Sequence, residues 1–110
     1  MKLVPTDTNI ANIFKKYGQV YVKAVIPKTA YPKMTADVGV VGIPNVLVCN
    51  TNADPTLIYN ILKAMFDHKQ ELVNVHSQAN ELMLENAVIK TVVPYHPGAV
   101  KFFKEKGAKM

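Results

Sequence analysis

Residues 38–66 read VGVVGIPNVLVC, then NTNADP, then TLIYNILKAMF. Residues 46–49 form a short, continuous apolar run, which is typical of a strand covered on both faces. Asp54 followed by Pro55 indicates a helix start, because the carboxylate accepts from free backbone amides and proline has no amide proton. The apolar residues beyond it recur at helical spacing: Leu57, Ile58, Ile61, Leu62, Met65 and Phe66. The stretch therefore predicts a strand, a polar turn and a helix that lies back across the strand.

The residues before this stretch predict a short helix and two strands. Residues 6–16 place Ile10, Ile13 and Phe14 on one side of a helix, with Thr6, Asp7 or Thr8 as its cap and Gly18 at its end. Residues 19–26 alternate apolar and mixed positions up to Pro27, as a strand does. Residues 28–37 read as a loop, and residues 38–43 as a strand interrupted by glycine.

The residues after it predict further helices. Residues 70–76 continue or restart the central helix, and Ser77 is a candidate cap for a short helical segment that reaches Leu84. His96 and Pro97 open a last helix, which Gly107 closes. The mixture of strand and helix patterns predicts an α/β fold.

Composition and charge limit the function classes. The chain has 110 residues, of which 49% are hydrophobic, so it can form one ordered domain or part of one. It has no run of about 18 apolar residues, and its first residues lack the apolar core of a signal peptide. The net charge is +5 without a single Arg, which argues against sequence-specific nucleic-acid readout.

The residues alone reveal no catalytic set. His68, His76 and His96 have no partner ligands at metal-site spacing, and neither a phosphate-binding glycine loop nor a nucleophile elbow is present. Cys49 ends an apolar run and is predicted to be a small buried hydrophobe rather than a reactive thiol. The segment that begins at His96 is either a capped turn or a helix start that presents amides to an anion. No cofactor and no metal are predicted.

Several segments, taken in order, carry a resemblance to a known family. They are IPKTAYP at residues 26–32, residues 37–48, LIYNILKAMF at residues 57–66, LENA at residues 84–87 and PYHPGAVKFFKEKG at residues 94–107. Together they resemble the C-terminal third of the TAXI family, the solute-binding receptors of tripartite ATP-independent periplasmic (TRAP) transporters. Each segment alone is weak, whereas the ordered set, which covers nearly the whole chain, is specific.

The resemblance implies part of a two-lobed fold of the periplasmic-binding-protein type II kind, with a ligand cleft between the lobes. Residues 1–37 would belong to the second lobe, residues 38–45 would cross over, and residues 46–110 would belong to the first lobe. The implied function is binding of a small organic acid or amino acid, such as glutamate, and its delivery to a membrane permease. A protein of this kind is not an enzyme, needs no cofactor and works in the periplasm.

The resemblance also implies where the ligand binds. The loop with the Ile-Pro-x-x-x-Tyr pattern corresponds to the family's segment near the cleft, so Tyr31 and Thr29 become the candidate ligand contacts. The residue types alone leave Tyr31 either a packing anchor or a ligand contact. Lys28 and Lys33 could help to hold an acid, although solvated lysines are the simpler interpretation. Val40 stands where the family usually has Thr, so a hydroxyl contact is missing or the ligand differs.

Two alternatives accompany this interpretation. A C-terminal third leaves inner apolar faces open, so the chain could be a structural remnant that self-associates to cover them and binds no solute. A small enzyme that uses Cys49 or a histidine is the other alternative.

Overall fold

A computed structural model describes residues 2–18, 20–90 and 93–110 and combines helices with a small sheet, which confirms the α/β prediction. The chain divides into two compact units, Met1–Leu47 and Val48–Met110. Within the described ranges, no helix has the length and hydropathy needed to span a membrane.

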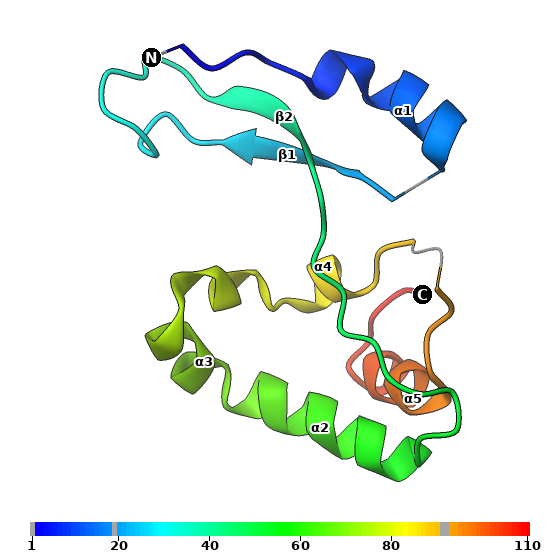
Figure 1. Ribbon diagram of the computed structural model, residues 1–110. Coiled ribbons are helices and arrows are strands. Elements are labelled where there is room, and N and C mark those ends of the chain that lie inside the picture. Colours follow the sequence, from blue (N-terminus) through cyan, green and yellow to red (C-terminus); the bar gives the residue numbers. More distant parts are fainter. Residues whose placement is uncertain (1, 19, 91–92) are drawn as a thin grey trace. The chain divides into compact units, whose positions relative to one another are not determined.

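The first unit pairs a β-hairpin with a short helix (Figure 1). A 3-10 turn, η1 (Asp7–Asn9), leads into α1 (Ile10–Tyr17) and then into β1 (Val22–Ile26) and β2 (Val38–Gly42). The strands are antiparallel, and their register places Val22 opposite Gly42 and Ile26 opposite Val38. Alternate residues of β1 are half-buried, as the strand pattern predicts. Val20 lies before this strand, and position 19 lies outside the described residues.

Hydrogen bonds join the segment before η1 to β2. The backbone amide of Thr6 donates to the carbonyl oxygen of Gly39 at 3.1 Å, and the amide of Val41 donates to Thr6 Oγ1 at 3.0 Å. Thr6 was a candidate helix cap, but neither Thr6 nor Asn9 makes a side-chain capping bond to the helical segments that follow them. The hydroxyl instead satisfies an amide on the outer edge of β2, which would otherwise lack a partner. Gly18 has a φ of 75°, which confirms the predicted helix end.

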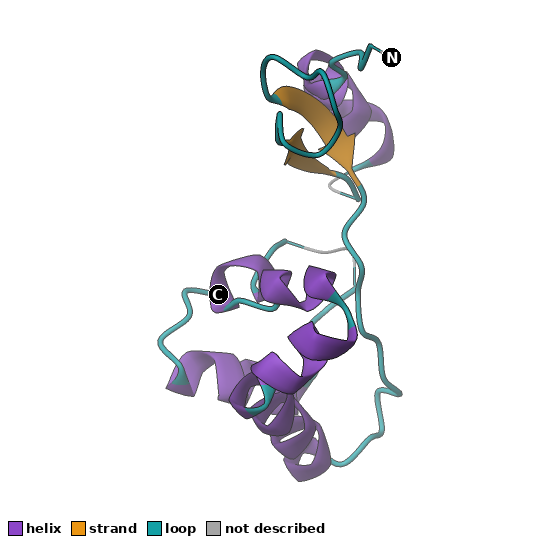
Figure 2. Ribbon diagram, turned by 90° about the vertical axis from the view of Figure 1, so that its left-hand side faces the viewer, coloured by secondary structure: helices purple, strands orange, loops and turns teal. Residues whose placement is uncertain are grey.

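The second unit is helical (Figure 2). It contains α2 (Pro55–Asp67), α3 (Lys69–Val75), η2 (Ser77–Glu81), α4 (Leu84–Ala87) and α5 (Pro97–Glu105). Asp54 caps α2 as predicted, because its carboxylate accepts from the amides of Thr56 and Leu57 at 3.3 and 3.1 Å. The cap of η2 is His76 and not Ser77, because His76 Nδ1 accepts from the amide of Gln78.

The core of the second unit forms where α5 packs on α2. Phe102 is fully buried and Phe103 almost so, and they lie 5.2 and 6.4 Å from Phe66, measured between ring centroids. Tyr59 meets Phe102 edge to face at 5.8 Å. Such edge contacts add to the burial of aromatic area, so this cluster stabilises the packing of α5 on α2.

Gly98 sets how closely the two helices approach. A Cβ atom at this position would lie 2.2 Å from the carbonyl oxygen of Pro55 and 3.1 Å from Cβ of Ile58. Any larger residue would therefore push the start of α5 away from the start of α2. The N-termini of the two helices lie together for this reason.

The predicted strand at residues 46–49 is wrong. Residues 43–50 form no regular element, and the backbone of residues 45–49 makes no hydrogen bond with any other described residue. Cys49 is exposed, so its predicted burial is wrong as well. A strand needs a neighbour for its amides and carbonyls, and neither β1 nor β2, the strands among the described residues, pairs with this stretch.

Candidate functional site

The candidate ligand loop connects β1 to β2 and is held by its own backbone. The amide of Lys28 donates to Asp37 Oδ1 at 2.8 Å, which closes the base of the loop. The amide of Ala30 donates to the carbonyl oxygen of Pro27 at 2.9 Å, and Lys33 adopts a φ of 69°. The loop is thus a sequence of tight turns fastened to the ends of two paired strands.

The side chains that the sequence singled out on this loop are exposed. Tyr31 is 45% exposed, and Thr29, Lys28 and Lys33 are exposed beside it in the chain. No side-chain hydrogen bond of Thr29 or Tyr31 to another described residue is present. The loop therefore presents an aromatic ring, a hydroxyl and two ammonium groups to solvent, and none of them is committed to packing in a core.

The position that departs from the TAXI pattern lies in the same hairpin. Val40 is half-buried in β2, directly opposite Ala24 of β1. Its apolar side chain suits this half-buried strand position. The structure thus gives Val40 a packing role.

A shallow hollow of about 310 Å³ lies in the second unit where α2 and α5 begin. It is lined by Pro55, Thr56, Tyr59, Pro97, Gly98 and Lys101. Lys101 Nζ lies 5.2 Å from the centroid of the Tyr59 ring, a cation–π distance. The sequence predicted both helix starts but not their proximity, because nothing local in the chain specifies that Gly98 packs against Pro55.

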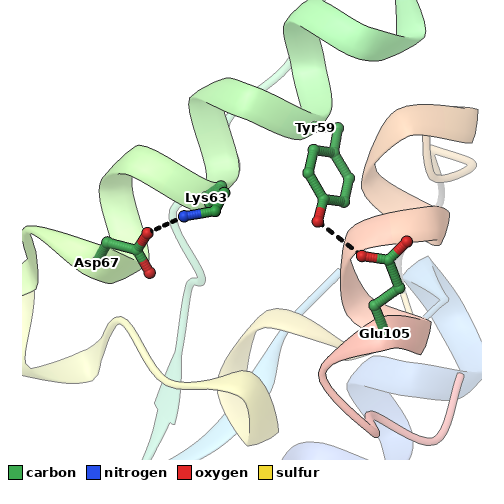
Figure 3. A network of polar contacts seen from close by, with 4 residues as sticks. All are labelled: Tyr59, Lys63, Asp67 and Glu105. Carbon is green, nitrogen blue, oxygen red and sulfur yellow. Dashed lines mark hydrogen bonds and ion pairs between the residues drawn. The ribbon is translucent and has the colours of Figure 1, made fainter.

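Polar side chains fasten the solvent side of the same helix pair (Figure 3). The hydroxyl of Tyr59 on α2 donates to Glu105 Oε2 on α5 at 2.6 Å, and Lys63 pairs with Asp67 one turn along α2. The bond to Glu105 raises the pKa of Tyr59, and the bond from Lys63 lowers the pKa of Asp67. Figure 3 shows the two contacts as neighbours, one within α2 and one between α2 and α5. Their geometry suits a structural clamp.

A second hollow, of about 330 Å³, is mostly apolar and is lined by Val88, Ile89, Lys90, Tyr95 and Met110. The Tyr95 hydroxyl lies 2.9 Å from the carbonyl oxygen of Ala87 and 2.6 Å from that of Ile89, so its proton is shared between two backbone acceptors. Burial raises the pKa of Tyr95. The ring and its hydroxyl thereby fix the chain around α4 against Phe103, at a centroid distance of 6.0 Å.

The histidines have structural roles. His96 Nδ1 accepts from the amide of Gly98 at 3.2 Å and caps α5, which agrees with the capped-turn alternative. His76 caps η2, and His68 Nδ1 lies 2.8 Å from Glu71 Oε1. Throughout the described ranges, no three His, Cys, Asp or Glu side chains gather closely enough to hold a metal ion.

Comparison with known families decides the class of this protein. The profile of the NMT1-like family matches residues 1–107, nearly the entire chain. The chain belongs to the NMT1-like family. Members of this family are binding proteins rather than enzymes, and their fold is of the periplasmic-binding-protein type. The NMT1-like assignment confirms the coarser part of the sequence interpretation, a solute-binding type of protein with a mixed α/β fold.

Proposed function

We propose that this NMT1-like chain is part of a TAXI-type solute receptor that delivers a small organic acid or amino acid, such as glutamate, to a TRAP permease. The family match over residues 1–107 is the observation that carries the proposal, since it supports a solute-binding protein. In this proposal residues 1–37 belong to the second lobe, residues 38–45 cross over and residues 46–110 belong to the first lobe. The receptor works in the periplasm.

Thr29 and Tyr31 are the proposed ligand contacts. Their loop is held at its base by the bond from the Lys28 amide to Asp37, yet its side chains face solvent. A ring, a hydroxyl and the ammonium groups of Lys28 and Lys33 are groups that can bind a carboxylate-bearing solute. A fixed backbone that carries uncommitted side chains limits the ordering cost of binding.

Calorimetric titration with glutamate and with dicarboxylates tests this site. Tyr31→Ala is expected to weaken binding at least tenfold, and Lys28→Gln with Lys33→Gln to weaken it further for acids. Tyr17→Ala is the matched control, because Tyr17 is another exposed tyrosine of the first unit. Equal affinities of the Tyr31→Ala and Tyr17→Ala variants would remove Tyr31 from the site.

A structural role without solute is the second candidate. It is favoured by the many large apolar side chains that stay exposed, among them Ile43, Leu47 and Val75. A thermal-shift screen of organic acids and amino acids separates the two candidates. A rise in melting temperature with one class of solute supports the receptor, and no rise with any class supports the structural role.

A further inference from the structure

The candidate ligand loop contains a turn with an unusual residue at its third position. The amide of Met34 donates to the carbonyl oxygen of Tyr31 at 3.4 Å, which closes a β-turn. Pro32 and Lys33 are its two central residues, and the φ of Lys33 is 69°. A positive φ directly after a central proline is the conformation of a type II turn. This position normally takes glycine, because a residue with a Cβ atom is strained there.

Pro32 does not impose this strain. A proline at the second position of a turn also fits a type I turn, in which the next residue has an ordinary negative φ. Among the described residues other than glycine, Lys33 alone has a positive φ. The bond from the Lys28 amide to Asp37 closes the base of the loop and limits the conformations that the turn can adopt. Strained residues that the surrounding structure maintains are concentrated at ligand-binding and catalytic sites.

The charges of the loop favour an anion as the partner of Lys33. Residues 28–36 include two lysines and no acidic residue, and Lys33 is exposed. The salt bridges found among the described residues lie elsewhere, in the second unit. The carboxylate at the base of the loop, that of Asp37, accepts from a backbone amide. The ammonium group of Lys33 can therefore be offered to a carboxylate from outside the chain.

We infer that Lys33 is the residue of this loop that binds a carboxylate group of the solute and so sets the preference for acids. The inference rests on the proposed receptor function and deepens it, because it assigns this contact to Lys33 rather than to both lysines of the loop. Lys33 lies in the same turn as Tyr31, the proposed aromatic contact. A glycine would fit the turn better, so the lysine lowers the stability of the loop while it supplies a charge.

Two substitutions at position 33 separate strain from charge. Lys33→Gly and Lys33→Ala both remove the ammonium group, but only glycine relieves the left-handed strain. Hydrogen exchange of the paired amides in β1 and β2, measured without solute, reports the stability of the first unit. Lys33→Gly is expected to slow this exchange relative to the wild type, whereas Lys33→Ala is expected not to slow it.

Calorimetric titration with glutamate and with succinate measures the role of the charge. Both Lys33→Gly and Lys33→Ala are expected to weaken binding about tenfold or more, the usual effect of losing a hydrogen bond to a charged group. Lys33→Arg keeps the charge and is expected to keep most of the affinity. Lys23→Gln is the matched control, since Lys23 is an exposed lysine of β1 outside the loop, and it is expected to leave the affinity within about twofold of the wild type.

The outcomes distinguish this inference from the proposed receptor function. If the wild type binds either acid and Lys33→Gly binds it equally well, the receptor function stands and the role of Lys33 is overturned. If exchange is no slower in Lys33→Gly than in Lys33→Ala, the turn is not strained and the inference fails as well. If the wild type binds neither acid, the receptor function itself fails, and the role of Lys33 fails with it.

Discussion

Gly98 brings the first turn of α5 into contact with the first turn of α2. A methyl group there would lie 2.2 Å from the carbonyl oxygen of Pro55, far inside van der Waals contact. Because the obstacle is backbone, the helices must separate to admit it. The close approach of Gly98 is therefore a requirement of the helix pair, and it gives a direct test of the packing.

We expect Gly98→Ala to lower the free energy of unfolding by about 1–3 kcal/mol, the usual cost of overpacking. Urea denaturation followed by circular dichroism measures it. Lys104→Ala, an exposed change on the same helix, is the control and is expected to stay within about 0.5 kcal/mol of the wild type. A Gly98→Ala variant as stable as that control would show that the two helix starts are not in contact.

Tyr59 makes the stability of the second unit depend on pH in the alkaline range. Its bond to Glu105 requires the protonated phenol and raises the pKa of Tyr59 in the folded chain. The resulting stabilisation is fully present below the unfolded pKa of about 10 and is lost as the pH rises through the higher folded pKa. In an absorbance titration of tyrosinate, Tyr59→Phe is expected to remove one late-titrating phenol. Glu105→Gln is expected to shift that phenol to lower pH, and an unchanged curve would contradict the bond.

At the scale of elements, the sequence predicted best the helices whose ends carry chemical signals. Asp54 with Pro55, and His96 with Pro97, mark the starts of α2 and α5, and Gly107 with a φ of 78° follows the end of α5. These signals act within one turn, so a single sequence contains them. The strand predicted at residues 46–49 failed because a strand depends on a partner distant in the chain.

In the candidate site, too, features set by local residues were predicted, whereas features set by residues distant in the chain were not. The position of Thr29 and Tyr31 in a loop between two strands followed from local turn residues and was correctly predicted. Tyr59 and Lys101 line a hollow that the sequence did not indicate, because they lie on two helices that residues 68–96 separate. Their proximity arises from the packing of Phe102 and Gly98, which no local pattern reports.

α5 is the element on which the second unit depends most. Phe102 and Phe103 are its most buried side chains, and the core cluster to which they belong contacts α2 and the chain around α4. We expect Phe102→Ala to cost about 3–5 kcal/mol, enough to unfold a small helical unit at ordinary temperature. Loss of helical ellipticity and of protected amides in α2 would show this. Leu57→Ala, which removes an exposed side chain from α2, is the control and is expected to leave the monomer folded.

The hairpin of the first unit depends on a threonine outside both strands. We expect Thr6→Val to lower the free energy of unfolding by about 0.5–1.5 kcal/mol, the net worth of an ordinary hydrogen bond, because the amide of Val41 loses its acceptor while the size of the side chain is kept. Amide hydrogen exchange measures it, with faster exchange expected at Val41. Thr8→Val is the matched control, since Thr8 is exposed in the neighbouring turn, and equal exchange in the two variants would dismiss the bond.

For the whole molecule, charge and exposed apolar surface act in opposite directions. The net charge of +5 opposes association of copies of the chain, while exposed apolar side chains such as Ile43 and Leu47 favour it. If the chain self-associates, we expect added sodium chloride to strengthen that association, since salt screens the repulsion and leaves apolar contacts intact. Sedimentation at low and high salt measures the change. Association that weakens in high salt would indicate ion pairs between the copies instead.

The helix pair also has a consequence for how the protein is made. α2 leaves the ribosome well before α5, so its apolar residues Ile58, Leu62 and Phe66 have no partner while residues 68–96 are being synthesised. The second unit therefore cannot complete its core in step with translation. During that interval the nascent chain displays an amphipathic helix, which is the kind of segment that molecular chaperones bind. The yield of folded protein in cells is therefore expected to depend on the supply of chaperones, even though the finished protein is stable.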